Sequence, residues 1–348
     1  MRFATIGTSD ICRRFIDALK QVDGASYELA YSRTPERAQA YAQEQGAERS
    51  CSSLEDLAAD PDVDAVYIAS PNALHTDQAK LMLSHGKHVF VEKSFAANAR
   101  LAREVFDLAE SQGLVAMEAM RNIHAPGFKK IAQVVSEDLG QVRAASFGFA
   151  KITSRIERLR AGERLNVFDP QMASGALMDM GVYTVEPTVA LWGRPQRVTC
   201  YGVTTTVPGE EDGAPFSKID LAGAALLDYG THTVQLSYGK IADDLALCQV
   251  QGEGGTLSFR GISGPEDLHL HTHKSNKMVY KADSSLGDPI PVEVVENDMV
   301  YELQDFIAAA GEGAKGPLAT RYRDITLGSL ELQDEMRRQL GVSFPADE

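Results

Sequence analysis

The first third of the chain alternates between two hydrophobic patterns. Short apolar runs are followed by stretches in which apolar residues recur every three or four positions, as Ile11, Phe15 and Leu19 do. We expect strands at 3–7, 27–32, 64–70, 88–91 and 114–120, and helices at 10–20, 34–45, 74–85 and 97–112. Strands that are apolar on both faces and are separated by helices predict a parallel sheet covered on both sides. Ligands bind beyond the carboxyl ends of such strands, and Lys93 lies just past one of them.

A different pattern begins near residue 123. Further elements are expected in this order: a helix at 126–138, a strand at 141–150, a polar loop at 151–168, a helix at 173–192, strands at 196–205, 221–228, 231–238, 245–251, 255–260 and 267–272, and helices at 298–310 and about 321–340. Short adjacent strands with glycine-rich turns predict an antiparallel sheet. We therefore expect an α/β domain over residues 1–122, and an α+β domain with a mostly antiparallel open sheet over residues 123–348.

A phosphate-binding loop is suggested after the first strand by Gly7-Thr8-Ser9-Asp10-Ile11-Cys12. Dinucleotide-binding loops carry glycine at the first, third and sixth of these positions, and here only Gly7 matches. Ser9 replaces the glycine that lets the backbone approach a pyrophosphate, and Cys12, which is small, replaces the glycine that lets helix and strand pack closely. The preceding strand and the helix N-terminus favour an anion site, but an ordinary strand-to-helix turn fits the residues equally well.

The end of the second strand bears on which dinucleotide would bind. An acidic residue about 20 residues past the glycine loop usually binds the ribose 2′-hydroxyl of NAD. Ser32-Arg33-Thr34 contains no carboxylate at this place, and an arginine can pair with a 2′-phosphate. The sequence therefore favours NADP over NAD, although a solvated arginine in a turn would look the same.

Several motifs, spread over nearly the whole chain, occur together in one family. They are the Gly7 loop, Ser70-Pro71-Asn72 with His75, Glu92-Lys93, Glu118-Ala119-Met120-Arg121, and GALMDMGVY at 175–183. With these motifs the chain resembles the Gfo/Idh/MocA oxidoreductases. The last motif is similar to a subgroup with tyrosine where inositol dehydrogenases carry histidine; it includes glucose–fructose oxidoreductase, dimeric dihydrodiol dehydrogenase and NADP-linked xylose dehydrogenase. The resemblance implies a Rossmann-type dinucleotide-binding domain over residues 1–122, and a substrate-binding and oligomerisation domain over residues 123–348.

The resemblance also implies the residues of the site. Lys93 would be the active-site lysine, Asp179 the acid that orients the substrate, and Tyr183 the proton donor. Arg121 would face the substrate. The position of His124 after the last parallel strand suits a residue that lines the substrate pocket, and equally a structural hydrogen bond between domains. The cofactor would contact Gly7, Thr8, Ser9, Asp10, Ile11, Ser32, Arg33, Thr34, Ser70, Pro71, Asn72, His75, Glu92 and Lys93.

The chain departs from the family motif at Ser94, where the family has proline, often after a cis peptide bond. A cis bond before another residue costs about 3 kcal/mol, so we expect a trans bond here. Ser94 and the incomplete glycine loop motivate an alternative function, an NADP-binding regulator or scaffold with impaired catalysis. The presence of Lys93, Asp179 and Tyr183 argues for an enzyme.

The spacing of Asp179 and Tyr183 has a physical meaning of its own. Four positions apart in a helix, the two side chains share one face. A proton donor beside an orienting carboxylate suits alcohol oxidation, and a nearby lysine ammonium would stabilise the phenolate. Spacing alone would favour a surface acid beside a core tyrosine, and the family match reverses that preference. Pro187 cannot donate to the Tyr183 carbonyl, so we expect the helix to kink near the site.

A metal site was considered at His269, His271 and His273, which alternate along one strand and share a face. Three imidazoles on one face could bind a metal ion. No carboxylate or cysteine pattern accompanies them, so a solvated strand face is expected, with no metal. The loop at 151–168 carries Arg155, Arg158, Arg160 and Arg164, which either shape specificity or are simply solvated.

Composition narrows the classes of protein. The 348 residues carry a net charge of −15, which disfavours nucleic acid as a partner. No membrane-spanning run or signal peptide is recognised, and four scattered cysteines suggest reduced thiols in the cytoplasm.

The expected function is NADP-dependent hydride transfer between nicotinamide and a carbinol carbon of a sugar, cyclic polyol or diol. The expected assembly is a homodimer through the open sheet, with a tetramer as the alternative.

Overall fold

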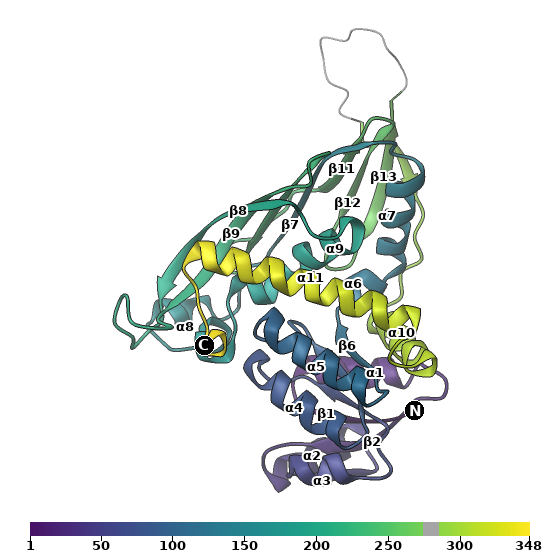
Figure 1. The fold of residues 1–348 in the computed structure, drawn as a ribbon, viewed down its shortest axis with the longest axis vertical. Helices are drawn as coiled ribbons and strands as arrows, with labels where there is room; N and C mark the ends of the chain where they lie inside the picture. Colours follow the sequence, from purple (N-terminus) through teal and green to yellow (C-terminus); the bar gives the residue numbers. More distant parts are fainter. Residues whose placement is uncertain (274–284) are drawn as a thin grey trace.

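The computed structural model describes residues 1–273 and 285–348, and it contains two sheets (Figure 1). The first sheet has six parallel strands in the order β3-β2-β1-β4-β5-β6. The strands are β1 (Arg2–Ile6), β2 (Ser26–Tyr31), β3 (Arg49–Cys51), β4 (Ala65–Ile68), β5 (His88–Glu92) and β6 (Ala116–Ala119). Their connecting helices are α1 (Asp10–Leu19), α2 (Pro35–Gln45), α3 (Leu54–Ala59), α4 (Asn72–Ser84) and α5 (Ala99–Ser111). The parallel sheet expected from the sequence is confirmed.

Strand β5 shows why this sequence forms a covered sheet. Val89, Phe90 and Val91 are fully buried, and successive side chains point to opposite faces. Val89 and Val91 join the hydrophobic cluster on one side of the sheet, while Phe90 joins the cluster on the other side. Strand β5 ends at Glu92, and Lys93 follows it at the carboxyl edge of the sheet.

The second sheet has eight strands in the order β14-β13-β12-β11-β7-β10-β9-β8. Only β7 and β10 pair in parallel, and the other neighbours are antiparallel. The strands are β7 (Val142–Ala150), β8 (Arg197–Thr206), β9 (Lys218–Asp228), β10 (Thr233–Gly239), β11 (Cys248–Gly252), β12 (Gly255–Arg260), β13 (Glu266–Thr272) and β14 (Asp288–Ile290). The expected mostly antiparallel sheet is therefore confirmed.

Helices join the two sheets. The longest, α11 (Pro317–Leu340), crosses between them (Figure 1), packing on α9 (Val182–Trp192) and β8 on one side and on α5 and β6 on the other. Helix α10 (Met299–Glu312) packs on α1, and its Phe306 stacks on Phe90 of the parallel sheet at 4.7 Å between ring centroids. The remaining helices are α6 (Arg121–His124), α7 (Pro126–Glu137) and α8 (Ile156–Arg160). The C-terminal helices therefore cover part of the first sheet as well as the second.

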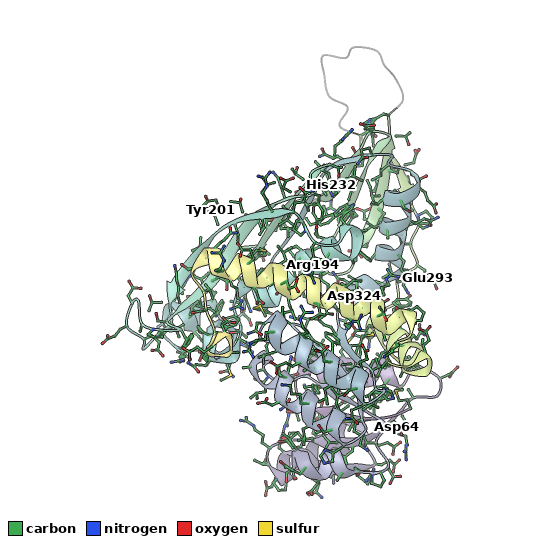
Figure 2. All side chains as sticks on the ribbon, in the orientation of Figure 1. Asp64, Arg194, Tyr201, His232, Glu293 and Asp324 are labelled. Atoms are coloured by element: carbon green, nitrogen blue, oxygen red, sulfur yellow. The ribbon has the colours of Figure 1, made fainter. Side chains whose placement is uncertain are left out.

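The face of the second sheet that carries Tyr201 is open. Tyr201 projects outward from β8 (Figure 2) and is 77% exposed. Val203 of β8 and Leu226 of β9 are also exposed. One row across this face contains Leu226, Gln235 and Ser146, and it continues through Gln249 and Ser258, so it carries no charge over these five strands. Within residues 1–273 and 285–348, no helix is long and apolar enough to cross a membrane.

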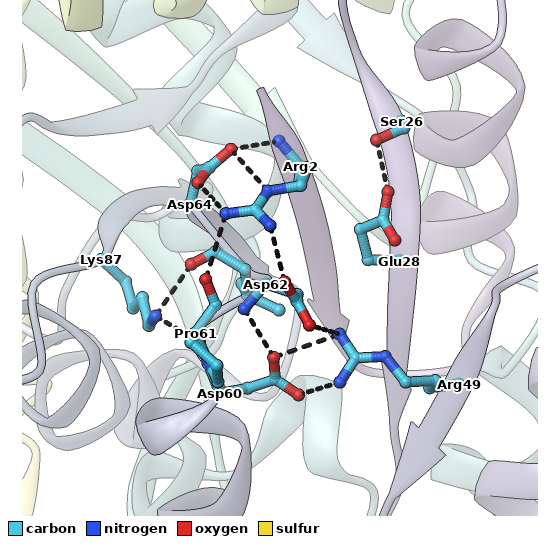
Figure 3. A network of polar contacts seen from close by, with 10 residues as sticks. Arg2, Ser26, Glu28, Arg49, Asp60, Pro61, Asp62, Asp64 and Lys87 are labelled. Carbon is cyan, nitrogen blue, oxygen red and sulfur yellow. Dashed lines mark hydrogen bonds and ion pairs between the residues drawn. The ribbon is translucent and has the colours of Figure 1, made fainter.

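A polar network ties the amino ends of the parallel strands together, at the edge opposite Lys93 (Figure 3). Arg2 at the start of β1 donates to the Asp64 carboxylate at 2.9 Å, just before β4. Lys87, which precedes β5, donates to the carbonyl of Val63 at 2.8 Å, and Arg49 pairs with Asp60. The charged side chains of this network all have partners. The candidate site residue Lys93 lies at the opposite edge of the sheet.

Short elements were the ones that the hydrophobic pattern did not predict. Strand β3 has three residues, none of them fully buried, and α3, α6, α8 and β14 are also short. Such segments bury too little apolar surface to produce a recognisable period. The long helix α11 begins at Pro317, four residues before its expected start, because proline at the first helical position fits the helix.

Candidate active site

Lys93 and Asp179 form the centre of the site. The Lys93 ammonium lies 2.5 Å from Asp179 Oδ1 and donates to the Asp179 carbonyl at 3.1 Å. Burial alone would lower the pKa of Lys93, but its acidic neighbours, with Asp179 first among them, together outweigh burial and raise it. The strand therefore ends in a charge that faces another functional residue rather than open solvent.

Asp179 has a second lysine partner that sequence reasoning missed. Lys240, the residue after β10, donates to Asp179 Oδ2, and its side chain is only 5% exposed. Its ammonium also lies 5.2 Å from the centroid of the Phe168 ring. Burial would raise the pKa of Asp179, but the two ammonium groups hold it well below its usual range. The available signal was a lysine directly after an apolar strand, the same signal that marked Lys93.

Tyr183 lies between two cations. The Lys93 ammonium is 5.3 Å and the Arg121 guanidinium carbon 5.6 Å from the centroid of the Tyr183 ring. Arg121 is itself held by Asp298, which also accepts a hydrogen bond of 2.8 Å from Arg14 of α1. Both cations therefore lie within cation–π distance of the Tyr183 ring. The family-implied grouping of Lys93, Asp179, Tyr183 and Arg121 is thus present in the structure.

The segment that carries Asp179 and Tyr183 is not a regular α-helix. Leu177–Gly181 forms a π-helical turn, and α9 follows directly with Pro187 inside it. Pro187 leaves the Tyr183 carbonyl without a helical donor, and Asn122 supplies one through its side-chain amide at 3.4 Å. The irregular geometry seen here is the π-helical turn directly before Tyr183, and the kink expected from Pro187 near the site stays a prediction.

The Lys93–Ser94 peptide bond is cis, so the expectation of a trans bond is wrong. The expectation considered the isolated peptide and left out its surroundings. Ser94 is fully buried, its hydroxyl donates to the Met178 carbonyl at 2.9 Å, and its own carbonyl lies 3.0 Å from His75 Nδ1. Serine at this position thus gains a hydrogen bond that proline could not make.

Two residues expected at the cofactor are buried behind the site. His75 is fully buried and bridges the carbonyls of Ser70, at 2.8 Å, and Ser94. Glu92 accepts a hydrogen bond from the Tyr67 hydroxyl, and burial raises the pKa of Glu92. This geometry suits residues that position the surrounding loops.

Close packing constrains Gly7 in the expected phosphate loop. Gly7 has φ +128°, and a Cβ there would lie 2.8 Å from the Ala69 carbonyl oxygen and 3.0 Å from Cys12 Sγ. Glycine is therefore required at this position. Ser9 is the N-cap residue of the ten-residue helix α1, with Thr8 before it and Asp10 and Ile11 in its first turn.

The residues expected to bind the ribose of the cofactor, Ser32, Arg33 and Thr34, are accessible to solvent. Ser32, Arg33 and Thr34 follow β2, and the Arg33 side chain is exposed with no ion-pair partner among the described residues. After β4, the Asn72 side chain donates to the Ala173 carbonyl at 2.9 Å, and Ser70 donates to Gln78 at 2.7 Å. These two groups of residues thus follow β2 and β4, the strands on either side of β1, at the carboxyl edge.

A cavity of about 170 Å³ lies at this edge. It is lined by Pro71, Asn72, Lys93, Asn166, Val167, Met172, Ser174, Met178 and Asp179. The cofactor turn, the lysine and the acid therefore share one cavity, as hydride transfer from a substrate beside a bound nicotinamide would require.

The histidines lie outside this group. His124 is fully buried, its Nδ1 lies 2.8 Å from the Asp305 carboxylate, and its ring packs on Tyr322. This arrangement favours the structural alternative for His124. His269 lies 3.0 Å from Asp267, and in the described part of the chain no group of three or more His, Cys, Asp or Glu residues could hold a metal ion.

Comparisons with known proteins identify the class and then the family. Residues 1–120 match the model of an oxidoreductase family with an NAD-binding Rossmann fold, and residues 128–258 match the GFO/IDH/MocA C-terminal domain. The chain belongs to the Gfo/Idh/MocA oxidoreductases, as its motifs indicated.

Curated proteins of similar sequence cover all or part of this chain. It is 33% identical to scyllo-inositol 2-dehydrogenase (NADP(+)) IolU of Bacillus subtilis, over 100% of this chain and 99% of the relative. It is 35% identical to D-xylose 1-dehydrogenase (NADP(+)) 2 of Haloferax volcanii, over 59% of this chain and 61% of the relative. The crystal structure of KijD10, a 3-ketoreductase from Actinomadura kijaniata, in complex with NADP and TDP-benzene, has the same fold, with a TM-score of 0.78, 22% identity and 99% coverage of both chains.

Proposed function

We propose that this protein is an NADP-dependent dehydrogenase or reductase that acts on a carbinol carbon of a sugar, cyclic polyol or related diol. The observation that carries the proposal is the grouping of Lys93, Asp179 and Tyr183. Lys93 and Asp179 line a cavity at the carboxyl edge of the parallel sheet, and the Tyr183 ring centroid lies 5.3 Å from the Lys93 ammonium. The full-length relative named as an inositol dehydrogenase and the partial relative named as a xylose dehydrogenase both support this substrate class.

Each site residue has a proposed role. The Tyr183 hydroxyl exchanges the proton of the reacting hydroxyl group, and the Lys93 ammonium, close to the ring, stabilises the phenolate. Asp179 is an acceptor that orients the substrate hydroxyl, and Lys93 and Lys240 hold its carboxylate in place. A bound nicotinamide would supply the hydride-accepting or hydride-donating carbon. Arg121 lies close to the Tyr183 ring, so we propose that it positions Tyr183 as well as contacting the substrate.

NADP is the proposed cofactor, as the sequence predicted. Gly7 and the N-terminus of α1 form the expected pyrophosphate site. Arg33 is exposed and free of ion pairs in the described chain, so it is available to a 2′-phosphate. Two relatives that carry NADP(+) in their names support the same choice.

The alternative function, a regulator with impaired catalysis, rested on Ser94 and on the incomplete glycine loop. Lys93 reaches Asp179 although serine follows it, so no observation favours this alternative over an enzyme.

The test is to supply the purified protein with NADP⁺ or NADPH and a panel of polyols, sugars and their ketones. Formation or consumption of NADPH that is lost in Tyr183→Phe supports the proposal. Tight NADPH binding without turnover of any panel member would favour the regulator.

The division of the chain and its assembly complete the proposal. Residues 1–122 would hold the cofactor, and residues 123–348 would supply the substrate-binding residues and the contact between subunits. The exposed apolar side chains of Tyr201, Val203 and Leu226 on the open face support a homodimer, with a tetramer as the larger alternative. The four free thiols, Cys12, Cys51, Cys200 and Cys248, support a cytoplasmic location.

A further inference from the structure

A second cavity shares Asp179 with the first. It measures about 600 Å³, and Val167 and Asp179 line both cavities. Residues 151–156, which follow β7, form most of its wall, together with Met180 and Lys240. A substrate that is oriented by Asp179 and is longer than one carbinol group would therefore extend into this second cavity.

The charges that line the second cavity are mainly positive. Lys151, Arg155 and Lys240 lie on its wall, and Asp179 is the one acid among its lining residues. Both oxygens of Asp179 are already bound by lysines. This local excess of positive charge stands out in a chain whose net charge is −15.

Arg155 differs from the other arginines of its loop. Arg158 pairs with Glu163 at 2.8 Å, and Arg160 pairs with Glu157 at 2.7 Å. Arg164 likewise pairs with an acid of its own neighbourhood. In the described part of the chain, Arg155 has no such partner, and neither does the Lys151 ammonium. Among the cations of residues 151–168, the two without an ion-pair partner in the described chain are the two that line the cavity.

Hydrogen bonds hold the loop with these cations in position. The backbone N–H groups of Lys151 and Thr153 donate to the carbonyls of Gly239 and Lys240, at 3.1 and 2.9 Å. The N–H of Ile152 donates to Asp243 Oδ1 at 2.9 Å. The Asp243 carboxylate is therefore bound to backbone and makes no ion pair with either cation. The loop presents positive charge from a fixed backbone.

We propose, on the basis of the dehydrogenase function above, that the substrate carries an anionic group, a phosphate monoester or a carboxylate, away from the carbinol that reacts. This group binds Arg155 and Lys151 while the hydroxyl groups near the reacting carbon bind Asp179 and Tyr183. The planar guanidinium fork of arginine matches both anions, and charge-assisted hydrogen bonds are stronger than neutral ones.

The experiment compares matched neutral and anionic substrates. It measures kcat/KM with NADP⁺ for D-glucose, D-glucose 6-phosphate and D-glucuronate, and for myo-inositol and myo-inositol 1-phosphate. At least one anionic compound is expected to exceed its neutral partner by about tenfold or more, the lower range for a charged hydrogen bond. This advantage should shrink as NaCl is added, because Arg155 and Lys151 are exposed. Preference for the phosphates or for glucuronate identifies the anion.

Two variants test where the anion binds. Arg155→Gln should lower the ratio of anionic to neutral kcat/KM by about tenfold. Arg158→Gln, which removes an exposed arginine paired with Glu163 on the same loop, should leave that ratio unchanged. Neutral compounds used as well as their anionic partners, or a ratio that survives Arg155→Gln, would overturn the inference and leave the proposed function standing. Absence of turnover with every compound would count against the proposed function itself.

Discussion

The Lys93 ammonium lies 2.5 Å from the Asp179 carboxylate although the two residues are 86 positions apart in the chain. Lys93 follows the fifth strand of the parallel sheet, and Asp179 lies in the π-helical turn beneath the second sheet. Their contact places an acid and a cation at one cavity, and the same cation lies 5.3 Å from the centroid of the Tyr183 ring. The predictions below test what each of these groups contributes.

Replacing Lys93 with methionine should abolish most turnover and keep the fold and much of the cofactor affinity. The cofactor would be held mainly by the Gly7 loop and Arg33, which belong to other strands. General acid–base groups contribute about 10²–10⁴-fold in rate, so Tyr183→Phe should lose activity in this range. The measurement is the steady-state kinetics of both single variants and of the double variant with one identified substrate.

The two losses should not add, because Lys93 acts largely through Tyr183. Lys80→Met is the control, since Lys80 pairs with Glu104 between α4 and α5. Turnover close to wild type in Lys93→Met would make Lys93 a structural partner of Asp179 and nothing more.

Replacing Arg33 with alanine should weaken NADPH binding and leave NADH binding nearly unchanged. A lost charged hydrogen bond costs about 1.5–3 kcal/mol, which is roughly tenfold or more in affinity. Calorimetric titration of both dinucleotides into both proteins measures the ratio. Arg143→Ala, which removes an exposed arginine of the second sheet, is the control. An unchanged ratio in Arg33→Ala, or tighter binding of NADH by wild type, would show that Arg33 does not bind the 2′-phosphate.

Replacing Asp179 with asparagine should destabilise the fold as well as reduce activity. It leaves the buried Lys240 and the nearby Lys93 without their counter-charge. Breaking fully buried pairs costs about 3–5 kcal/mol, and we expect about 2 kcal/mol here because the Asp179 side chain is 37% exposed. Urea denaturation measures the change.

The double variant Asp179→Asn/Lys240→Met should recover part of that loss, since it removes one of the unpaired charges. Asp324→Asn, at an exposed pair with Arg323, should change stability little. A double variant less stable than Asp179→Asn would mean that Lys240 stabilises the fold through its packing on Phe168 rather than through its charge.

Replacing Glu118 with glutamine should flatten the pH dependence of stability. Burial raises the pKa of Glu118 from its ordinary value near 4.5 to about 7, while Glu118 accepts a hydrogen bond of 2.8 Å from the Phe95 N–H beside Ser94. The folded state therefore holds a proton that the unfolded state releases between these two pH values, and stability falls as pH rises from about 4.5 to 7. Glutamine keeps the acceptor without the ionisation.

The measurement is the free energy of unfolding of wild type and Glu118→Gln at several pH values between 4.5 and 7. Burial also raises the pKa of Glu186 and Glu302, so the variant should reduce the decline without removing it. His75 and His124, whose pKa values are lowered by burial, act in the opposite direction in both proteins. Parallel curves for the two proteins would mean that Glu118 ionises in the folded state much as it does in the unfolded one.

Placing lysine at Tyr201 and Leu226 should convert the proposed dimer into a monomer. Both side chains are exposed on the open sheet, and two like charges repeated on each subunit would face each other across a two-fold contact. Light scattering during gel filtration measures the mass. Val294→Lys is the control, because Val294 is 65% exposed and lies outside the second sheet, before α10. A wild-type protein that elutes only as a monomer would exclude this assembly.

The regular elements and the central site residues could be predicted from the sequence. Apolar runs on both faces marked the parallel strands, and the charge of Lys93 at the end of one of them marked the carboxyl edge. The spacing of Asp179 and Tyr183 indicated that they belong together, and the family resemblance supplied their roles. These features are local in sequence or appear as a motif, so a single chain reveals them.

Contacts between distant segments could not be predicted. Lys240 binds Asp179 only because the end of β10 meets the π-helical turn, and Asn122 satisfies the Tyr183 carbonyl only because α6 packs beside α9. The cis bond before Ser94 depends likewise on the surroundings of one buried serine. Periodicity contains no information about such contacts, since each depends on how two elements dock.

The two lysines that bind Asp179 come from different sheets, and this has a consequence for exchanging domains between relatives. Lys93 belongs to the parallel sheet, while Lys240 and Asp179 belong to the second half of the chain. In a chimera with the second half of a relative, the acid of the foreign half must lie within contact of Lys93 from the original first half. A mismatched pair would leave charge buried at the seam, so electrostatic compatibility at Asp179 limits which halves can be recombined.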